Sequence, residues 1–341
     1  SFDLSALELL FSADEIWHAV KLLPTGKAPG PDGFTAEFLR SAWTIIKADI
    51  VEAFGKLYEL NGQSFQRLNE ALLTLLPKRP YTASLSDYRP ISLIHLLAKL
   101  FAKVLSLRLT PMLGEMVSPN QSAFISGRCI HDNLFLVQPT ARHLHHRKLS
   151  RILLKLDIAK AFDSVSWPFL LETLRHLGFS PRWREWISIL LSMASTKVLL
   201  NGLPGPPIRH CKGLRQGDPV SPMLFVIVID VLNRLFQRAT SLGLLQRLTD
   251  RHMASSLSLY ADDVVLFCHP DACDLSAVRH ILGLFGTASG LHTNLDKCAA
   301  LPIRCNPELR DSLPGLFPSL LASFFYRFPH KDFSSSFKDN S

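Results

Sequence analysis

Two adjacent aspartates inside an apolar run limit, more than any other feature, what this chain can fold into. In SLSLYADDVVLFC (256–268), strand-forming apolar residues lie on both sides of Asp262 and Asp263. Two carboxylates in an apolar setting cost on the order of several kcal/mol unless another group compensates their charge. The segment therefore predicts two buried strands joined by a tight turn, with compensation for the two charges close to that turn.

Composition favours a well-packed protein with an anionic partner. The 341 residues are 47% hydrophobic and carry a formal net charge of +8, with an isoelectric point near 9.3. The hydrophobic share supports a sizeable core, and the length allows two or three domains or one large interleaved one. The basic excess favours a polyanion, most simply nucleic acid, although a surface adjusted for solubility also explains it.

The cysteine pattern and the apolar runs exclude several classes of protein. The six cysteines form no CxxC pair and no Cys/His spacing typical of zinc sites, which favours reduced thiols in an intracellular, non-secreted protein of the nucleus or cytoplasm. No uncharged apolar run reaches the ~18 residues of a membrane helix, so no membrane partner is expected. The chain starts at Ser1 without a signal peptide, which predicts a fragment of a longer chain.

Hydrophobic periodicity predicts helices mixed with strands. GKAPGPDGF (26–34) is typical of a structured loop, and Asn201-Gly202 between two strand-like runs predicts a hairpin. Arg89 and Pro90 are expected to precede a helix. The other predicted helices cover 13–23, 35–60 and 221–239, and the predicted strands cover 71–80, 151–157 and both halves of 256–268.

Asp157 is a third carboxylate at the end of a strand-like run, in LLKLDIA (153–159). A single buried aspartate is usually a cap or an ion-pair partner, but three from two separate strands are harder to explain in that way. Carboxylates brought together repel and raise one another's pKa, and a divalent cation removes the conflict. Mg²⁺ prefers such oxygen ligands, and two ions can activate a hydroxyl and stabilise a leaving pyrophosphate.

Seven ordered blocks of sequence resemble one protein family. LDIAKAFDSV, GLRQGDPVSP and LYADD resemble the palm motifs of reverse transcriptases. GKAPGPDGF, LLPK with DYRPISL, and NQSAFISGRCIHDN resemble the non-LTR (LINE-type) retrotransposon enzymes, in a plant-like form, which are related to group II intron reverse transcriptases. The resemblance covers about residues 13–305.

The resemblance implies an α+β right-hand polymerase fold with fingers and palm, an antiparallel palm sheet with packed helices, and a thumb that is absent or truncated. It implies an N-terminal helical region with the GKAPGPDGF loop (1–70) and reverse transcriptase fingers and palm (71–305). Residues 306–341, where Phe and Ser dominate without a clear period, are expected to be a divergent, disordered tail.

The resemblance assigns the catalytic triad to Asp157, Asp262 and Asp263. Asp157 and Asp262 are expected to bridge two Mg²⁺ ions, for which Mn²⁺ is a possible substitute. Asp263 is expected to lie more peripherally, and the backbone carbonyl of Ile158 is expected to be an additional ligand.

The resemblance also implies residues beside the nucleotide and the primer. Phe162 matches an aromatic steric gate that rejects a ribose 2′-hydroxyl, with ordinary core packing as the alternative. Gln216 matches the glutamine beside the incoming nucleotide, and Gly217 and Pro219 let the backbone pass close to base and template. Tyr260 is expected near the primer end or the template.

Basic residues are implied at the phosphates. Lys78 and Arg89 resemble residues of the fingers that grip the triphosphate, with exposed charges beside a strand and a helix as the alternative. Lys297 matches a lysine that either protonates pyrophosphate or caps its own element. Salt-sensitive contacts with the backbone of template or hybrid are expected from three further residues: Arg108, Arg128 and Lys212.

The implied function is that of an RNA-directed DNA polymerase in retrotransposition, with RNA template, DNA primer, RNA–DNA hybrid and dNTPs as partners. The oligomeric state is not indicated. A catalytically silent RNA- or hybrid-binding remnant of a degenerate element is the main alternative. An RNA-dependent RNA polymerase shares the palm chemistry, but Tyr260-Ala261 before the aspartate pair and Phe162 argue against it.

Overall fold

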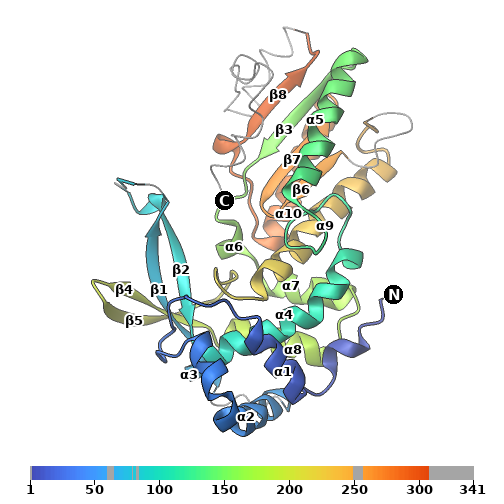
Figure 1. Ribbon diagram of the computed structural model, residues 1–341. Coiled ribbons are helices and arrows are strands. Elements are labelled where there is room, and N and C mark those ends of the chain that lie inside the picture. The colour runs from blue at the N-terminus through green and yellow to red at the C-terminus, as the bar shows by residue number, and fades with distance from the viewer. Residues whose placement is uncertain (1, 60–64, 79, 82–83, 249–255, 307–341) are drawn as a thin grey trace.

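The computed structural model describes residues 2–59, 65–78, 80–81, 84–248 and 256–306, and Figure 1 shows their α+β architecture. Two four-stranded sheets have the strand orders β2-β1-β4-β5 and β6-β7-β3-β8. The first sheet contains β1 (Glu70–Pro77), β2 (Tyr88–Ile94), β4 (Ser195–Leu200) and β5 (Leu203–Arg209). The second contains β3 (Arg151–Leu156), β6 (Leu257–Tyr260), β7 (Asp263–Cys268) and β8 (Ala299–Ile303).

Helices form the rest of the body. The α-helices are α1 (Ala13–Lys21), α2 (Ala36–Tyr58), α3 (Phe65–Leu68), α4 (Leu96–Met116), α5 (Ile130–His146), α6 (Ala161–Ser164), α7 (Trp167–His176), α8 (Pro181–Ser192), α9 (Ser221–Ser241) and α10 (Ala272–Ser289). The short 3-10 helices are η1 (Ser5–Glu8), η3 (Leu85–Asp87) and η4 (Leu295–Lys297). No helix in the described residues is both long enough and apolar enough to span a bilayer.

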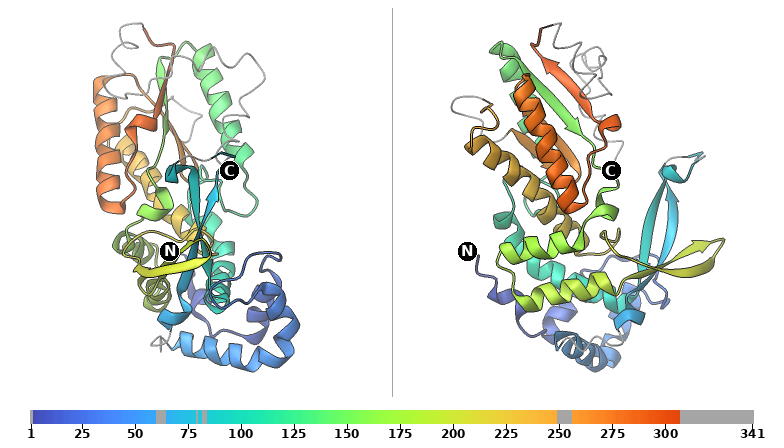
Figure 2. Two further views of the ribbon diagram at one scale, coloured as in Figure 1. Left: turned by 90° about the vertical axis from the view of Figure 1, so that its left-hand side faces the viewer. Right: turned by 180° about the vertical axis from the view of Figure 1, so that it is seen from behind.

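The second sheet is antiparallel throughout and lies between α5 on one face and α9 with α10 on the other (Figure 2). Alternate side chains of a strand point to opposite faces. Leu154 and Leu156 join the large core that includes α9 and α10, whereas Leu153 joins Val137 and Leu144 of α5 in a smaller cluster. The palm predicted from the sequence resemblance is this sheet with its packed helices.

The first sheet consists of two hairpins joined by parallel pairing of β1 with β4. Both hairpins project from the helical body in Figure 1. The β4–β5 turn contains Asn201 and Gly202 with φ of 50° and 81°, the backbone that favours Asn-Gly in two-residue hairpins. The hairpin predicted from this dipeptide is therefore confirmed.

The helix predicted to follow Arg89 and Pro90 is present as α4, but it begins only at Leu96, because strand β2 continues to Ile94. Strand β2 lies at the edge of its sheet, where proline is tolerated. The N–H of Ser92 donates to the Gln216 carbonyl rather than to β1. The nitrogen of Pro90, two residues earlier, lies on the same side of the strand and therefore also faces away from β1. Pro90 therefore removes no hydrogen bond from the β1–β2 ladder.

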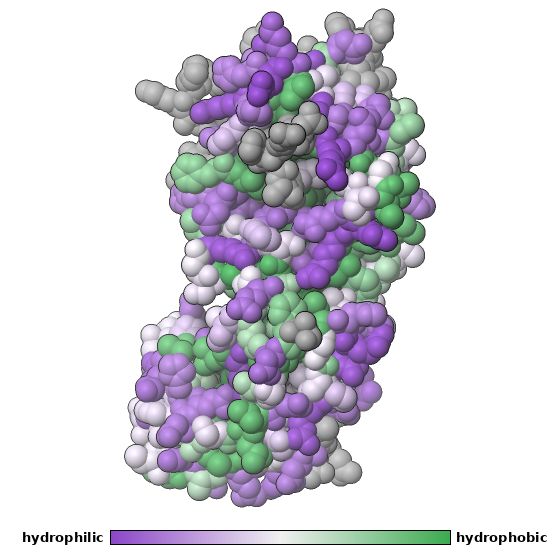
Figure 3. All heavy atoms as spheres, turned by 90° about the vertical axis from the view of Figure 1, so that its right-hand side faces the viewer, coloured by the Kyte–Doolittle hydropathy of each residue, from purple (hydrophilic) through white to green (hydrophobic). Residues whose placement is uncertain are grey.

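One hydrophobic core connects the N-terminal helices to the palm. It contains residues from Leu4 to Ala300, with Trp183, Trp186 and Phe101 among its largest fully buried side chains. The helices predicted at 13–23 and 35–60 are present as α1 and α2. On the described surface of the face in Figure 3, hydrophobic residues form several small groups among hydrophilic ones.

The predicted division into 1–70, 71–305 and 306–341 stays a prediction. The tail predicted at 306–341 lies, beyond its first residue, outside the described residues.

Candidate active site

The aspartate pair lies at the turn between β6 and β7. Tyr260 pairs with Asp263, so Ala261 and Asp262 form the turn, and Ala261 has a φ of 51°. The N–H of Ala261 donates to Oε1 of buried Gln121 at 3.2 Å. This bond holds the turn that carries the exposed Asp262 side chain.

Asp157 lies beside this pair because of the register between β3 and β7. Leu156, the last residue of β3, pairs with Val264, so Asp157, which follows the strand, lies opposite Asp263. Although Asp262 is exposed on the turn, the surrounding protein partly desolvates the carboxylates of Asp262 and Asp263 and so raises the pKa of both, and the negative charge of Asp157 raises each further. Lys155 opposes this effect at Asp263. The structure therefore brings the three aspartates together, while their catalytic roles stay predictions.

The donor set fits a hard divalent cation. It consists of carboxylate oxygens whose mutual repulsion a cation would relieve. Within the described part of the chain, no three His, Cys, Asp or Glu side chains are already grouped around one metal position. The fit therefore rests on the ligand chemistry and on the electrostatic coupling of the three aspartates.

The segment after α10 supports the backbone of Asp157. The carbonyl of Asp157 accepts from the N–H of Asn294 at 2.8 Å, and the N–H of Asp157 donates to Sγ of buried Cys298 at 3.4 Å. Ile158 forms a β-bridge with Thr293, in which the bonds use the carbonyl of Asp157 and the N–H of Ala159. The bridge leaves the carbonyl of Ile158, the predicted additional ligand, unused.

A buried polar network supports the outer strand of the hairpin. Asn133 Nδ2 donates to the Leu259 carbonyl at 2.6 Å and to Ser258 Oγ at 2.8 Å, and the N–H of Leu259 donates to the Asn120 carbonyl at 2.9 Å. Gln121 accepts from the turn, as described above. The sequence prediction missed these supporting roles, although the polar residues of NQSAFISGRCIHDN were a signal for them.

The loop after β5 contacts strand β2. The Gln216 carbonyl accepts from Ser92, and a Cβ on Gly217, at φ 102°, would lie 3.1 Å from the Ser92 carbonyl oxygen. Asp218 is buried, accepts from the N–H of Val220 at 3.0 Å and lies 3.4 Å from Arg215. The carboxylate of Asp218 is therefore engaged within its own turn.

Phe162 lies in α6, five residues after Asp157. Its ring stacks on Phe225 of α9, with 4.6 Å between the centroids and 15° between the planes. Phe162 is half-buried, so part of its ring remains accessible. The contact agrees with ordinary packing, and the role as a steric gate stays a prediction.

The remaining predicted residues lie at the edges of this region. Tyr260 and Pro219 are half-buried, and Lys297 is exposed in η4. The N–H of Lys78 donates to Asp87, and Arg89 pairs with Leu76 at the projecting end of β1–β2. The structure therefore places these two basic residues on the first sheet, separate from the aspartate hairpin (Figure 1).

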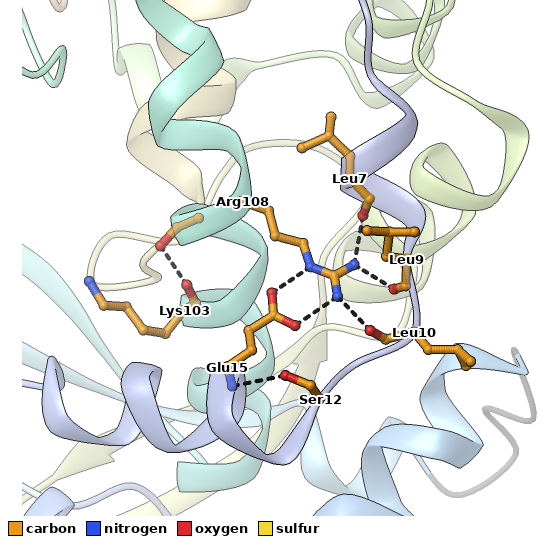
Figure 4. A network of polar contacts seen from close by, with 8 residues as sticks. Leu7, Leu9, Leu10, Ser12, Glu15, Lys103 and Arg108 are labelled. Carbon is orange, nitrogen blue, oxygen red and sulfur yellow. Dashed lines mark hydrogen bonds and ion pairs between the residues drawn. The ribbon is translucent and has the colours of Figure 1, made fainter.

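Arg108 does not contact nucleic acid, contrary to the prediction, because its guanidinium is enclosed by the N-terminal segment (Figure 4). Its Nε and Nη2 bind Glu15 at 2.6 and 2.8 Å, and its Nη groups donate to the carbonyls of Leu7, Leu9 and Leu10. The Nη groups of half-buried Arg128 donate to three carbonyls within its own loop and the end of α4, and its contact with nucleic acid stays a prediction. Lys212 is exposed, and its prediction stays open to test.

The antiparallel sheet, the carboxylate-bearing hairpin and the helices behind it define the palm of a right-hand nucleic-acid polymerase. A model of the reverse transcriptase (RNA-dependent DNA polymerase) family matches residues 76–306, more than half of the chain, and the chain belongs to this family. Enzymes of this family generally use divalent metal ions such as Mg²⁺ together with an RNA template, a primer and dNTPs.

The curated relatives are proteins of non-LTR retrotransposons. The chain is 33% identical over 299 residues to the uncharacterized 149 kDa protein of transposon TX1 from Xenopus laevis, covering 86% of this chain and 22% of that protein. It is 26% identical over 309 residues to the Pol polyprotein of element R2DM from Drosophila melanogaster, covering 89% of this chain and 28% of that protein. The chain thus spans about a quarter of the length of these relatives. The prediction of a plant-like element stays a prediction.

A solved structure supports the fold alone. Apo telomerase from Candida tropicalis, truncated from its C-terminal domain, matches with a TM-score of 0.50 at 11% identity, covering 71% of this chain and 51% of that chain. The right-hand fold predicted from the sequence is thereby confirmed.

Proposed function

We propose that this chain is the RNA-directed DNA polymerase module of a non-LTR retrotransposon. A primer 3′-hydroxyl attacks the α-phosphate of a dNTP opposite an RNA template, and pyrophosphate leaves. The observation that carries the proposal is the electrostatic coupling of Asp157, Asp262 and Asp263 at the palm hairpin of a reverse transcriptase family member. The nucleic-acid and nucleotide substrates imply that the module acts in the nucleus or the cytoplasm.

The ligands proposed for two Mg²⁺ ions, or for Mn²⁺ as a substitute, are Asp157, Asp262 and the Ile158 carbonyl, with Asp263 more peripheral. When bound, such ions supply hydroxyl activation and neutralise charge on the phosphates. The hydrogen bonds from Asn294 and to Cys298 fix the backbone of Asp157, so this carboxylate keeps its place beside the hairpin.

The nucleotide and the primer are assigned to residues around this hairpin. Phe162 limits the space at the sugar, and Gln216 lies beside the incoming nucleotide. Gly217 and Pro219 border the template, and Tyr260 precedes the hairpin turn and faces the primer end. Three basic residues are proposed for the triphosphate or the leaving pyrophosphate: Lys78, Arg89 and Lys297.

Primer extension on an RNA template with dNTPs and Mg²⁺ tests the proposal. Asp262→Asn with Asp263→Asn is expected to reduce extension by at least about a hundredfold, because the charge that would hold the metal is removed. Asp49→Asn, an exposed change on α2, is the matched control and is expected to retain activity. Extension by the double variant at the wild-type rate would refute the assignment of the site.

A catalytically silent RNA- or hybrid-binding remnant is the second candidate. Tight binding of an RNA–DNA hybrid without incorporation of any nucleotide, in Mg²⁺ or Mn²⁺, would select this candidate over the polymerase.

A further inference from the structure

Helix α9 is connected to the aspartate hairpin by polar side chains that the proposed function leaves without a role. In a helix that otherwise buries mostly apolar residues, Asp230 and Asn233 are only 2% and 0% exposed. Their partners lie in the loop 117–129, which joins α4 to α5 and runs beside strand β6. A buried polar side chain costs free energy unless it is hydrogen-bonded, so these contacts show what the two residues hold.

Both residues of α9 bind the start of this loop. Asp230 Oδ1 accepts from the N–H of Ser118 at 2.9 Å, and Asn233 Nδ2 donates to Ser118 Oγ at 2.6 Å. Arg234 adds a second connection, because its Nε donates to Asp230 Oδ2 at 3.0 Å and its Nη2 donates to the Met116 carbonyl at 2.6 Å. The end of α4 and the start of the loop are therefore fixed to α9.

The amide of Asn233 continues these contacts toward strand β6. Asn233 Oδ1 accepts from Asn120 Nδ2 at 3.0 Å, and Asn120 Nδ2 also donates to the Leu257 carbonyl at 2.9 Å. The N–H of Leu259 donates to the Asn120 carbonyl at 2.9 Å, and the Leu259 carbonyl accepts from the N–H of Ser122 at 3.1 Å. This part of the loop thus pairs with the outer edge of β6.

The contacts end at the turn that carries Asp262. Gln121, which follows Asn120, accepts from the N–H of Ala261 at 3.2 Å, and Ala261 directly precedes Asp262. Strand β6 has four residues, and β7 is its only neighbour in the order of the described strands. Because the loop holds the other edge of β6, a displacement of the loop would move the turn and its carboxylate.

Stability alone does not explain a polar network at this place. Gln121 Nε2 and Asn133 Oδ1 are buried and have no hydrogen-bond partner among the described residues. Unpaired buried atoms lower stability, and a partly satisfied polar network is less stable than apolar packing. Hydrogen bonds add a defined distance and direction at each contact, which apolar packing does not. The network is therefore suited to setting the position of the hairpin.

We propose that Asp230 and Asn233 are positioning residues, which act through the loop and β6 to hold the turn where Asp262 lies beside Asp157. The inference deepens the proposed function and rests on it for the role of the three aspartates. A displacement of about 1 Å at a reacting group can cost on the order of a hundredfold in rate. Groups that orient metal ligands change metal affinity about 10- to 100-fold when they are removed.

Binding of Mn²⁺ to the full chain, measured by electron paramagnetic resonance, tests this role without requiring catalysis. Asn233→Leu keeps roughly the size of the side chain and removes its hydrogen bonds to the loop. It is expected to raise the Mn²⁺ concentration at half-saturation at least about tenfold. Binding that remains in the variant with Asp262→Asn and Asp263→Asn is subtracted. Ser118→Ala removes one acceptor from a half-buried residue, should give a smaller shift, and keeps the test possible if Asn233→Leu does not fold.

Phe236→Leu is the matched control, because Phe236 is a buried residue of the same helix whose apolar side chain takes no part in the network. This change should lower the melting temperature and leave the Mn²⁺ affinity unchanged. The effects of Asn233→Leu and Gln121→Met on Mn²⁺ affinity should not be additive, since both act on one turn. Equal Mn²⁺ affinities of the wild type and folded Asn233→Leu overturn the proposal, as does an equal shift in Phe236→Leu.

The result for this network is separate from the result for the polymerase. Absent primer extension by the wild type, with a Mn²⁺ affinity that still falls in Asn233→Leu, would refute the polymerase proposal and support the positioning role. Normal primer extension by the wild type, with unchanged Mn²⁺ affinity and unchanged extension in Asn233→Leu, would refute the positioning role alone.

Discussion

The enclosed guanidinium of Arg108 gives a quantitative prediction about what holds the N-terminal segment to α4. Only 8% of the Arg108 side chain and 26% of the Glu15 side chain are exposed. Replacing Arg108 with methionine leaves the Glu15 carboxylate and three backbone carbonyls without their donor. Breaking a buried pair costs about 3–5 kcal/mol, and the partial exposure of Glu15 favours the lower end of that range, about 3 kcal/mol.

Urea unfolding followed by tryptophan fluorescence measures this change, since Trp183 and Trp186 are fully buried in the same core. Arg108→Met with Glu15→Gln should recover at least about 1 kcal/mol, because the unpaired charge is removed as well. Arg175→Met, which breaks an exposed pair on α7, is the control and should change stability little. Arg108→Met with unchanged stability but weaker RNA binding would refute the structural role.

Three further predictions concern the site itself. Gly213→Ala should lower the free energy of unfolding in urea by at least about 1 kcal/mol. The φ of Gly213 is 84°, and the new Cβ would lie 2.6 Å from the Asp163 carbonyl oxygen. An unchanged free energy of unfolding would mean that the loop shifts freely. Gln121→Met should reduce extension more than stability, because it removes the acceptor of the turn N–H before the aspartate pair. Gln121→Glu keeps an acceptor and should restore part of the rate; equal loss in both variants would contradict this role. In EDTA, stability should fall as pH rises above 3.8, the ordinary aspartate value, because the raised pKa values of Asp262 and Asp263 make the folded state hold protons that the unfolded chain releases. Between pH 4 and 8, the melting temperature of the variant with Asp262→Asn and Asp263→Asn should change less with pH than that of the wild type. Mg²⁺ should stabilise the wild type more than this variant. Parallel curves of melting temperature against pH for the two proteins would contradict the argument.

The sequence predicted elements whose signals are local. The Asn201-Gly202 turn, the amphipathic α1 and the strands around the aspartate pair each carry their pattern within a few residues. The convergence of Asp157 with that pair was also predictable, because repelling carboxylates in apolar runs need a common compensating charge. Strand β2 was missed because Pro90 disfavours strands in general, and only the edge position of β2 makes it harmless.

The error at Arg108 has a different cause. An arginine in a basic sequence is expected to be exposed, but the partners of Arg108 lie 93 to 101 residues away in the chain. Gln121 likewise acts on a residue 140 positions later. No local pattern contains such pairs, so these roles become visible only when tertiary packing is known.

The central place of β3 in the palm sheet has a consequence for synthesis on the ribosome. Both neighbours of β3 come from later sequence, and Asp263, the start of β7, follows Leu156 by 107 residues. At about 5–20 residues per second, β3 leaves the ribosome roughly 5–20 s before its first partner is made. During that interval the nascent strand has two unpaired edges, which can pair wrongly with other chains. The aspartates at the palm can therefore meet only after β7 has been made, and a chaperone that shields β3 until β7 and β8 emerge should raise the yield of folded protein.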